Sequence, residues 1–285
     1  MYNIILENED GDQLTFNHIG GDFQIIDVDG LYPPTATINT NQTALVDGAT
    51  FNSSKVDMRT MNIAFSIEQN AEKNRIEVYK VLRVKRPVKF YYKSEMRDVF
   101  INGYVESVTV DHFAQKQTVT LSMLCPFPYF KNAEEVVNEM SAIASMFHFP
   151  FHSTSTPQIV FGSYDPNAVI YVPNLGMLET GITFELYAKD AISNPKIYNY
   201  QTQEFFGLDF DMVAGDQITI STGQGEKWVR LLREGVETNI FNYISEGSTW
   251  LQLPAGGAAF VYTIDSGMMS QLVIQIKHYD IYEGV

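Results

Sequence analysis

Cysteine is almost absent from this sequence, which has a single one, Cys125, among 285 residues. One cysteine excludes an internal disulfide framework and a zinc site built from several thiolates. Long apolar runs are absent as well, because no stretch approaches the roughly 20 apolar residues of a membrane helix. The opening residues 1–13 lack the basic and apolar regions of a secretory signal peptide. The sequence therefore predicts no membrane partner and no Sec-type export.

Basic residues are scarce, since 19 Lys and Arg stand against 34 Asp and Glu and give a formal net charge of −15. This shortage argues against a general nucleic-acid-binding protein, because neutralising phosphates requires Lys and Arg. The exception is Lys73–Arg97, a segment with nine basic and two acidic residues. It is either a solvated helix face and hairpin or a positive rim that meets an acidic surface on a partner or another copy of this chain. Both interpretations stay open.

Residues that commonly bind metals or act as nucleophiles are few. Among five histidines only His148 and His152 are close in sequence, and Pro150 prevents the helix that an i, i+4 metal pair needs. We therefore predict no metal site and no cofactor. Cys125, beside a proline in an apolar stretch, is expected to be a small core residue rather than a nucleophile.

Acidic side chains in the second half leave one catalytic alternative. Glu204, Asp209, Asp211 and Asp216 offer carboxylates, and glycosidases use two such groups. Surface carboxylates occur throughout an acidic protein, however, and no nucleophile motif accompanies these. We predict that the protein is not an enzyme, and a β-rich glycosidase using Glu204, Asp209 or Asp211 is the last of three functional hypotheses.

The composition indicates β structure, because Tyr and Phe are abundant and favour the pleated, half-buried surface of a sheet. Short runs of alternating apolar and polar residues predict strands at residues 61–67, 99–105, 117–123, 182–187, 217–221 and 272–276. Strands at such spacing are typical of sandwiches or barrels rather than of βαβ units. The fold class expected is mainly β.

Two segments have helical spacing. The first covers residues 70–82, with Asn70 as the N-cap and an apolar face that comprises Ile76, Tyr79, Val81 and Leu82. The second covers residues 132–146, with Asn132 as the N-cap and an apolar stripe made of Val136, Val137, Met140, Ile143 and Ala144. Two prolines follow it. The length fits two domains, which we predict at residues 1–140 and 158–285, joined by a connection at 141–157.

The order of motifs resembles a known family. The segments Arg59–Ile67, Val88–Tyr92 and Val99–Val105, followed by a closing Cys-Pro-Phe-Pro-Tyr-Phe at residues 125–130, are similar to the N-terminal domain of the distal tail protein of phages with long, non-contractile tails. The second half resembles that family's C-terminal domain in the order of its motifs, which are Gly215–Ile220, Trp228–Leu232, Thr249–Gly256, Leu272–Ile276 and His278–Tyr282. The resemblance spans nearly the whole chain.

The resemblance implies a structural virion component. Its N-terminal domain would be a β-barrel or sandwich with one helix that forms a homohexameric ring, and its C-terminal domain a galectin-like β-sandwich. The ring would join the tail tube protein to the tail-tip hub, the tail-associated lysin, and in some phages would anchor a receptor-binding protein. The expected location is the virion's tail tip, after assembly in the bacterial cytoplasm. The genome would pass through the ring without specific binding.

Two departures from the family pattern bear on function. Phe127 stands between the two prolines of the closing motif, where the family often carries an acidic residue. The chain also has no room for an inserted carbohydrate-binding domain. This favours an adaptor, a protein that only joins the tail tube protein to the tail-tip hub. A second hypothesis is a carbohydrate- or receptor-binding tail protein that acts through the C-terminal sandwich, with Trp228 and Trp250 as candidate contacts and core packing as their alternative role.

Closing a ring requires two unlike patches on each subunit, and unpaired sheet edges can provide them. The basic segment offers a further patch, which could face an acidic surface such as Glu7–Asp12 of a neighbouring copy. We therefore predict interface positions at Arg83, Lys85, Arg86 and Lys89.

Overall fold

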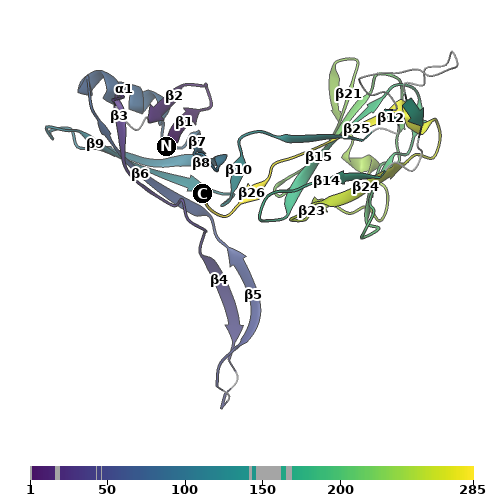
Figure 1. Cartoon of the computed structure of the whole chain (residues 1–285), viewed down its shortest axis with the longest axis horizontal. Coiled ribbons are helices and arrows are strands. Elements are labelled where there is room, and N and C mark those ends of the chain that lie inside the picture. The colour runs from purple at the N-terminus through teal and green to yellow at the C-terminus, as the bar shows by residue number, and fades with distance from the viewer. Residues whose placement is uncertain are drawn as a thin grey trace, which may run out of the picture. The chain divides into compact units, whose positions relative to one another are not determined.

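The computed structural model describes residues 2–16, 20–42, 44–45, 47–140, 143–145, 162–164 and 169–285. These residues form two compact units, the first comprising Met1–Glu134 with Ile281–Val285 and the second Glu135–Asp280. Both are built almost entirely of strands, which confirms the predicted mainly β, two-domain architecture (Figure 1). The predicted connection at 141–157 lies outside the described residues apart from 143–145.

The first unit is organised around one antiparallel sheet with the strand order β2-β1-β7-β8-β9-β6-β3. Its strands are β1 (Asn3–Asn8), β2 (Gln13–Phe16), β3 (Phe23–Asp29), β6 (Arg59–Ile67), β7 (Pro87–Lys93), β8 (Asp98–Val110) and β9 (Thr118–Cys125). Two short strands, β10 (Phe130–Asn132) and β26 (Ile281–Tyr282), extend it, since β10 pairs with both β8 and β26. A separate hairpin consists of β4 (Ala36–Asn41) and β5 (Thr50–Val56).

Alternation along the strands builds the core of this unit. In β6, Met61, Ile63 and Phe65 are fully buried while Thr60 and Asn62 face outward. The three rings Phe16, Phe23 and Phe65 pack together, with the Phe16 and Phe65 centroids 4.8 Å apart. The period of two in the sequence therefore decides which face of the sheet is apolar.

The helix α1 (Ala71–Val81) confirms the first predicted helix and part of its apolar face, since Val81 and the C-cap residue Leu82 are buried as predicted. Its buried residues are Asn74, Val78 and Val81, whereas Ile76 and Tyr79 are 60% and 42% exposed. Asn70 occupies the N-cap position without a side-chain hydrogen bond to the helix. Asn74 can be buried at low cost because its amide donates to the Gln69 carbonyl (2.7 Å).

The second unit has two larger sheets. One has the order β11-β25-β15-β20-β21-β22, with β11 at Val136–Met140, β25 at Leu272–His278, β15 at Thr180–Ala188, β20 at Gln217–Gly223, β21 at Glu226–Arg233 and β22 at Val236–Asn239. The other has the order β14-β24-β17-β18, with β14 at Ile170–Val172, β24 at Ala258–Thr263, β17 at Lys196–Asn199 and β18 at Phe205–Gly207. Short elements complete the unit: β12 (Ile143–Ser145), β13 (Gly162–Tyr164), β16 (Ile192–Ser193), β19 (Asp211–Met212), β23 (Gln252–Leu253) and the 3-10 helices η1 (Phe241–Tyr243) and η2 (Met269–Gln271).

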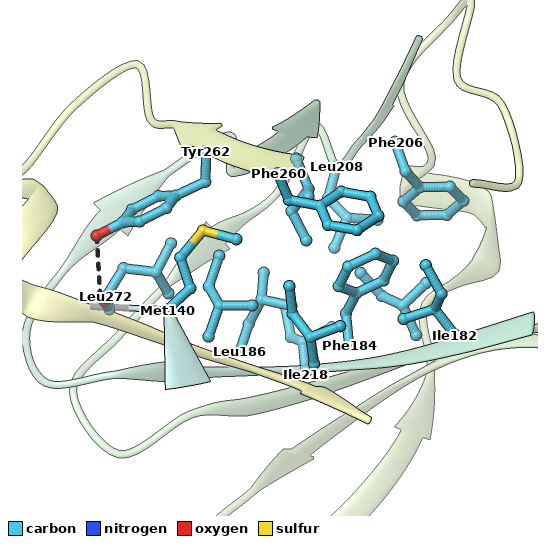
Figure 2. Close-up of a cluster of buried hydrophobic side chains, with 14 of the residues drawn as sticks. Met140, Ile182, Phe184, Leu186, Phe206, Leu208, Ile218, Phe260, Tyr262 and Leu272 are labelled. Carbon is cyan, nitrogen blue, oxygen red and sulfur yellow. Dashed lines mark hydrogen bonds between the residues drawn. The ribbon is translucent and has the colours of Figure 1, made fainter. Parts of the chain in front are cut away.

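The apolar side chains of these two sheets face one another (Figure 2). Phe184 of β15 meets Phe260 of β24 edge to face, with ring centroids 5.9 Å apart. The buried Tyr262 donates its hydroxyl to the Met269 carbonyl at 2.8 Å, so its one polar atom is satisfied. The unit is therefore a β-sandwich.

The second predicted helix, residues 132–146, is wrong. Residues 130–132 form β10 and residues 136–140 form β11, which pairs along its length with β25. The apolar residues Val136, Val137 and Met140 suit a helix by spacing, but the strand covers the edge of the sandwich sheet and buries only Met140 fully. Tertiary pairing overrides the local pattern here.

The predicted second domain, residues 158–285, includes the end of the chain. In the structure, residues 281–285 belong to the first unit instead. β26 pairs with β10, joining Phe130 to Tyr282 and Lys131 to Ile281. The backbone of Val285 also donates to the Leu31 carbonyl (3.0 Å). The first unit therefore contains both ends of the chain.

Candidate functional site

The hairpin β4–β5 is the most exposed regular structure of the first unit. Every residue of β4 is exposed, and so is every residue of β5 except Val56, which is half-buried. In Figure 1 the two strands form a ribbon that projects from the sheet of the same unit. A lone two-stranded hairpin is only marginally stable in water. Because its residues are exposed, both faces of this ribbon are available to another surface.

The two faces of the hairpin differ in character. Opposite residues share a face, so the pairings Ala36–Val56, Ile38–Ser54 and Thr40–Phe51 define one side. That side is largely apolar, and Ile38 and Phe51 are 62% and 63% exposed. The opposite side is wholly polar, and it consists of Thr37, Asn39, Asn41, Thr50, Ser53 and Lys55. The hairpin is therefore amphipathic, with its apolar side uncovered in the isolated chain.

Arg59 anchors the base of this hairpin. It is 5% exposed, and its guanidinium donates to the carbonyls of Gly30 (2.5 Å), Tyr32 (3.0 Å), Pro128 (2.6 Å) and Glu283 (2.5 Å). Burial lowers the pKa of Arg59, which still carries its charge because an arginine titrates far above neutral pH. One side chain thus joins the segment that enters β4, the closing motif and the chain's last residues.

The predicted basic interface residues lie in the loop after α1 and on β7. Arg83 bonds Asp10 of its own chain (2.6 Å), and Arg86 lies 3.3 Å from Glu9. Lys89 is paired across strands with Glu7, and its ammonium lies 5.7 Å from the Phe100 ring centroid. The acidic segment Glu7–Asp12, which we expected on a neighbouring copy, therefore lies beside the basic segment of the same chain.

Lys80 makes a further ion pair between the basic and acidic segments of the same chain, since its ammonium bonds Asp12 at 2.8 Å. The hydrogen bond from Lys80 lowers the pKa of Asp12. Lys85, the remaining candidate, is exposed and its backbone has a positive φ of 68°. Whether any of the four residues lies at an interface between subunits stays a prediction.

Three of the four carboxylates that made up the catalytic alternative accept side-chain hydrogen bonds, whereas Asp211 is exposed and its backbone carbonyl accepts from Arg233 (3.3 Å). Asp216 is buried, and Arg233 bonds it in a bidentate manner (2.5 and 2.8 Å), which lowers the pKa of Asp216. Asp209 accepts from the Ser245 hydroxyl (2.6 Å), and Glu204 accepts from Thr202 (3.1 Å). Within the described ranges, no three His, Cys, Asp or Glu side chains gather closely enough to hold a metal ion.

Cys125 is fully buried in the first core, as predicted, and burial raises the pKa of its thiol to about 12. A thiol that stays protonated is a poor nucleophile. The histidine pair His148 and His152 lies outside the described residues. In the part of the chain that the structure describes, no helix has the length and apolar character needed to cross a membrane.

The two tryptophans occupy different surroundings. Trp250 packs on the Phe206 ring (4.9 Å between centroids) and on Phe241 (5.9 Å), against the edge of the core. Trp228 lies on β21 with the Arg230 guanidinium over its ring, 4.5 Å from the centroid. Core packing is thus the role of Trp250, while Trp228 belongs to the outward face of its sheet.

Comparison with known families gives two matches, one in each half of the chain. Residues 11–125 match the family described as a phage tail protein RIFT-related domain. Residues 175–275 match the C-terminal domain of a siphovirus-type tail component. A search of curated proteins finds no match.

Solved structures show the same fold over almost the whole chain. The Dit protein of phage SPP1, described as a paradigm of the hub adsorption apparatus in phages that infect Gram-positive hosts, matches with a TM-score of 0.68 at 14% identity over 98% of each chain. A chain of the phage P2 baseplate in its activated conformation with Ca matches with a TM-score of 0.57 at 11% identity, covering 100% of this chain and 99% of that one. A chain of the same baseplate with Sr matches with a TM-score of 0.55 at 12% identity, covering 97% of this chain and 98% of that one.

These matches define the class of protein as a structural component of a phage tail. The chain belongs to the siphophage distal tail protein family, as its motifs predicted. Family and fold are those of structural tail proteins and are consistent with the prediction that the chain is not an enzyme. The β4–β5 hairpin is not among the strands predicted from the sequence, although Ala36 and Ile38 alternate with polar residues there.

Proposed function

We propose that the first unit assembles into a homohexameric ring at the distal end of the tail. The ring joins the tail tube protein on one side to the tail-tip hub, the tail-associated lysin, on the other, and provides a mount for a receptor-binding protein. The subunits assemble in the host cytoplasm before the tail is complete. Membership of the distal tail family supports this role, and the neighbours that come from baseplate or hub assemblies agree with it.

The observation that carries the proposal is the amphipathic hairpin β4–β5. Its apolar side, with Ile38 and Phe51, is exposed in a single chain, and burying two such side chains is worth about 1.5–3 kcal/mol each. A ring needs a heterologous contact, in which one subunit's projecting element meets a different surface of the next. The hairpin is such an element, and its apolar side packs on a neighbouring copy.

Charge supports the proposal in a second way. Arg83 and Arg86 are paired within their own chain, whereas Lys85 and Lys89 are exposed and form no ion pair with a carboxylate of the described residues. Lys85 and Lys89 therefore orient the contact between subunits. A net charge of −15 also reduces adhesion of DNA to a pore through which it passes.

The test replaces residues 36–56 with a three-residue Gly-Ser-Gly linker and measures mass by light scattering, with negative-stain imaging of the same sample. The wild type is expected to show rings of six chains at high concentration, and the shortened chain only monomers with native circular dichroism. A shortened chain that still forms rings would show that the hairpin does not close them.

A finer variant pair uses the two sides of the hairpin. Ile38→Thr with Phe51→Ser removes the apolar side and is expected to abolish the ring. The matched control, Asn39→Ser with Thr50→Ser, alters the polar side and leaves the ring intact. Equal loss of ring assembly in both variants would indicate a general effect on the hairpin rather than burial of its apolar side.

The charge contribution is tested with Lys85→Glu and Lys89→Glu together. We expect weaker ring assembly at low salt and a smaller difference from wild type at high salt, because salt screens exposed charges. Lys189→Glu, an exposed lysine of the second unit, is the matched control. Unchanged assembly at low salt would remove these two residues from the interface.

A further inference from the structure

The outer face of the sandwich sheet carries a small pocket. Alternation places Ile218, Ile220, Val229 and Leu231 in the core, so their neighbours along β20 and β21 point away from it. The pocket has a volume of about 180 Å³. It is lined by Gln217, Thr219, Trp228, Arg230, Leu232 and Glu237, which come from β20, β21 and β22.

Three of these side chains hold one another in place. Glu237 accepts a hydrogen bond from Nη1 of Arg230 at 2.7 Å, and the Arg230 guanidinium lies over the Trp228 ring at 4.5 Å. Glu237 lies opposite Leu232 on the neighbouring strand, so this contact joins β21 to β22. An aromatic ring, a guanidinium and a carboxylate are thus ordered before any ligand arrives, which reduces the entropy cost of binding.

Donors and acceptors remain available around this group. Within the described residues, Nε and Nη2 of Arg230 have no hydrogen-bond partner, nor does the Thr219 hydroxyl. Gln217 donates to the Tyr187 hydroxyl at 3.3 Å and keeps its carbonyl oxygen for a ligand. The pocket therefore offers both donors and acceptors within the reach of one small ligand.

The charges at this face are matched. Arg230 is paired with Glu237, and on the adjoining strands Lys277 bonds Glu185 at 2.7 Å. An anionic ligand gains little from an arginine whose charge is already matched, in a chain of net charge −15. A purely apolar ligand would leave these polar groups unpaired, and Leu232 is the one aliphatic side chain in the lining. The chemistry favours a neutral, hydroxyl-rich ligand.

We propose that this pocket binds one ring of a neutral saccharide, such as a unit of a cell-surface polysaccharide. A pyranose presents C–H groups on one face and hydroxyls around its rim, so it can contact Trp228 while its hydroxyls bond Arg230, Glu237 and Thr219. The volume lies below the range of about 300–1,000 Å³ typical of drug-sized ligands, which suits a single ring. This binding goes beyond the proposed ring function and does not depend on assembly.

The test follows the two indole N–H signals of the full chain by NMR, with Trp228→Phe to assign them. The probes are galactose, glucose, rhamnose, N-acetylglucosamine and N-acetylgalactosamine, each titrated to about 50 mM because single sugars with few contacts bind with a Kd in the millimolar range. At least one sugar is expected to shift the Trp228 signal in a saturable manner. The Trp250 signal, which reports on the core edge, should not move.

Two pocket variants, one control variant and two charged probes complete the test. Arg230→Met and Glu237→Gln are expected to weaken binding of the active sugar at least about tenfold, while a Lys189→Glu variant binds like the wild type. The inference is overturned if no sugar moves the Trp228 signal, if Arg230→Met binds unchanged, or if glucuronate or inorganic phosphate produces a larger shift than every neutral sugar. The pocket residues all belong to the second unit, and the titrations are recorded at a concentration where light scattering shows single chains, so ring failure and pocket failure are told apart.

Discussion

The hairpins β4–β5 and β20–β21 have similar lengths and opposite surroundings. In β20 the side chains of Ile218 and Ile220 are fully buried, whereas no residue of β4 is buried at all. Each hairpin also has a charged residue at its base. Asp216 directly precedes β20 and binds Arg233 at the end of β21, and Arg59 binds the carbonyls of Gly30 and Tyr32, just before β4.

The comparison separates two sources of stability. The β20–β21 hairpin is held by its own chain, because one face forms half of a sandwich. The β4–β5 hairpin has only its base fixed, so its own chain leaves the apolar side exposed. In the proposed ring, a neighbouring copy buries this side. Mutations should therefore affect folding in the first case and assembly in the second.

The largest expected contrast is between two phenylalanines. Phe184→Ala in the sandwich should lower the free energy of unfolding of the second unit by about 3–5 kcal/mol, because it leaves a cavity in a packed core. Phe51→Ala on the hairpin should change the stability of the monomer by less than about 0.5 kcal/mol. Urea unfolding of monomeric protein, read at each unit, measures both. Comparable losses would contradict the distinction.

A smaller loss is expected at the base of the exposed hairpin. Arg59→Met removes four hydrogen bonds to buried or half-buried carbonyls and should destabilise the first unit by about 3 kcal/mol. Hydrogen exchange should then accelerate at Val285, whose amide bonds Leu31. Arg59→Lys should not restore protection, since an ammonium cannot reproduce the planar guanidinium. Full rescue by lysine would show that only the charge matters.

Asp216→Asn, at the base of the β20–β21 hairpin, should lower the free energy of unfolding of the second unit by about 2 kcal/mol. The reason is that weaker bonds replace the charge-assisted pair with Arg233. The Arg233 guanidinium holds the pKa of Asp216 below its usual 3.8. The stabilisation is therefore complete above that value and is lost as pH falls through the lower, folded pKa. Wild type and variant should converge in acid unfolding curves, and parallel curves would contradict this assignment.

The smallest effect concerns His278, which is buried with Nε2 3.4 Å from Asp280. Burial lowers the pKa of His278 from 6.5, against the opposing influence of Asp280. The unfolded chain then binds the proton more readily, so stability is complete above pH 6.5 and declines as pH falls from 6.5 towards the folded pKa. His278→Gln should flatten this part of the stability profile. If wild type and variant lose stability equally as pH falls below 6.5, the decline belongs to another titrating group.

The sequence predicted the strands of both cores because residues such as Met61, Ile63 and Phe65 alternate cleanly with polar ones. It failed at Val136–Met140, where the apolar spacing suits a helix but pairing with β25 makes a strand. Arg59 could not be recognised as an anchor, because its partners at residues 30, 32, 128 and 283 come from distant parts of the chain.

The candidate sites show the same limit. Charge counting found the basic segment, but only the fold places Glu9 and Asp10 beside Arg86 and Arg83. Trp228 and Trp250 could not be distinguished by sequence, because both stand in strand-like runs. The fold separates them: Trp228 lies on the outward face of β21, whereas Trp250 lies in an irregular segment before β23 and packs on Phe206 and Phe241.

The most direct test of the account is a cross-link between the hairpin and a neighbouring subunit. A photoreactive amino acid at position 51, on the apolar side, is illuminated at high protein concentration, with position 39 on the polar side as the control. Ladders of up to six chains are expected from position 51 and few from position 39. Only monomeric product from position 51, in a sample that forms rings by imaging, would contradict it.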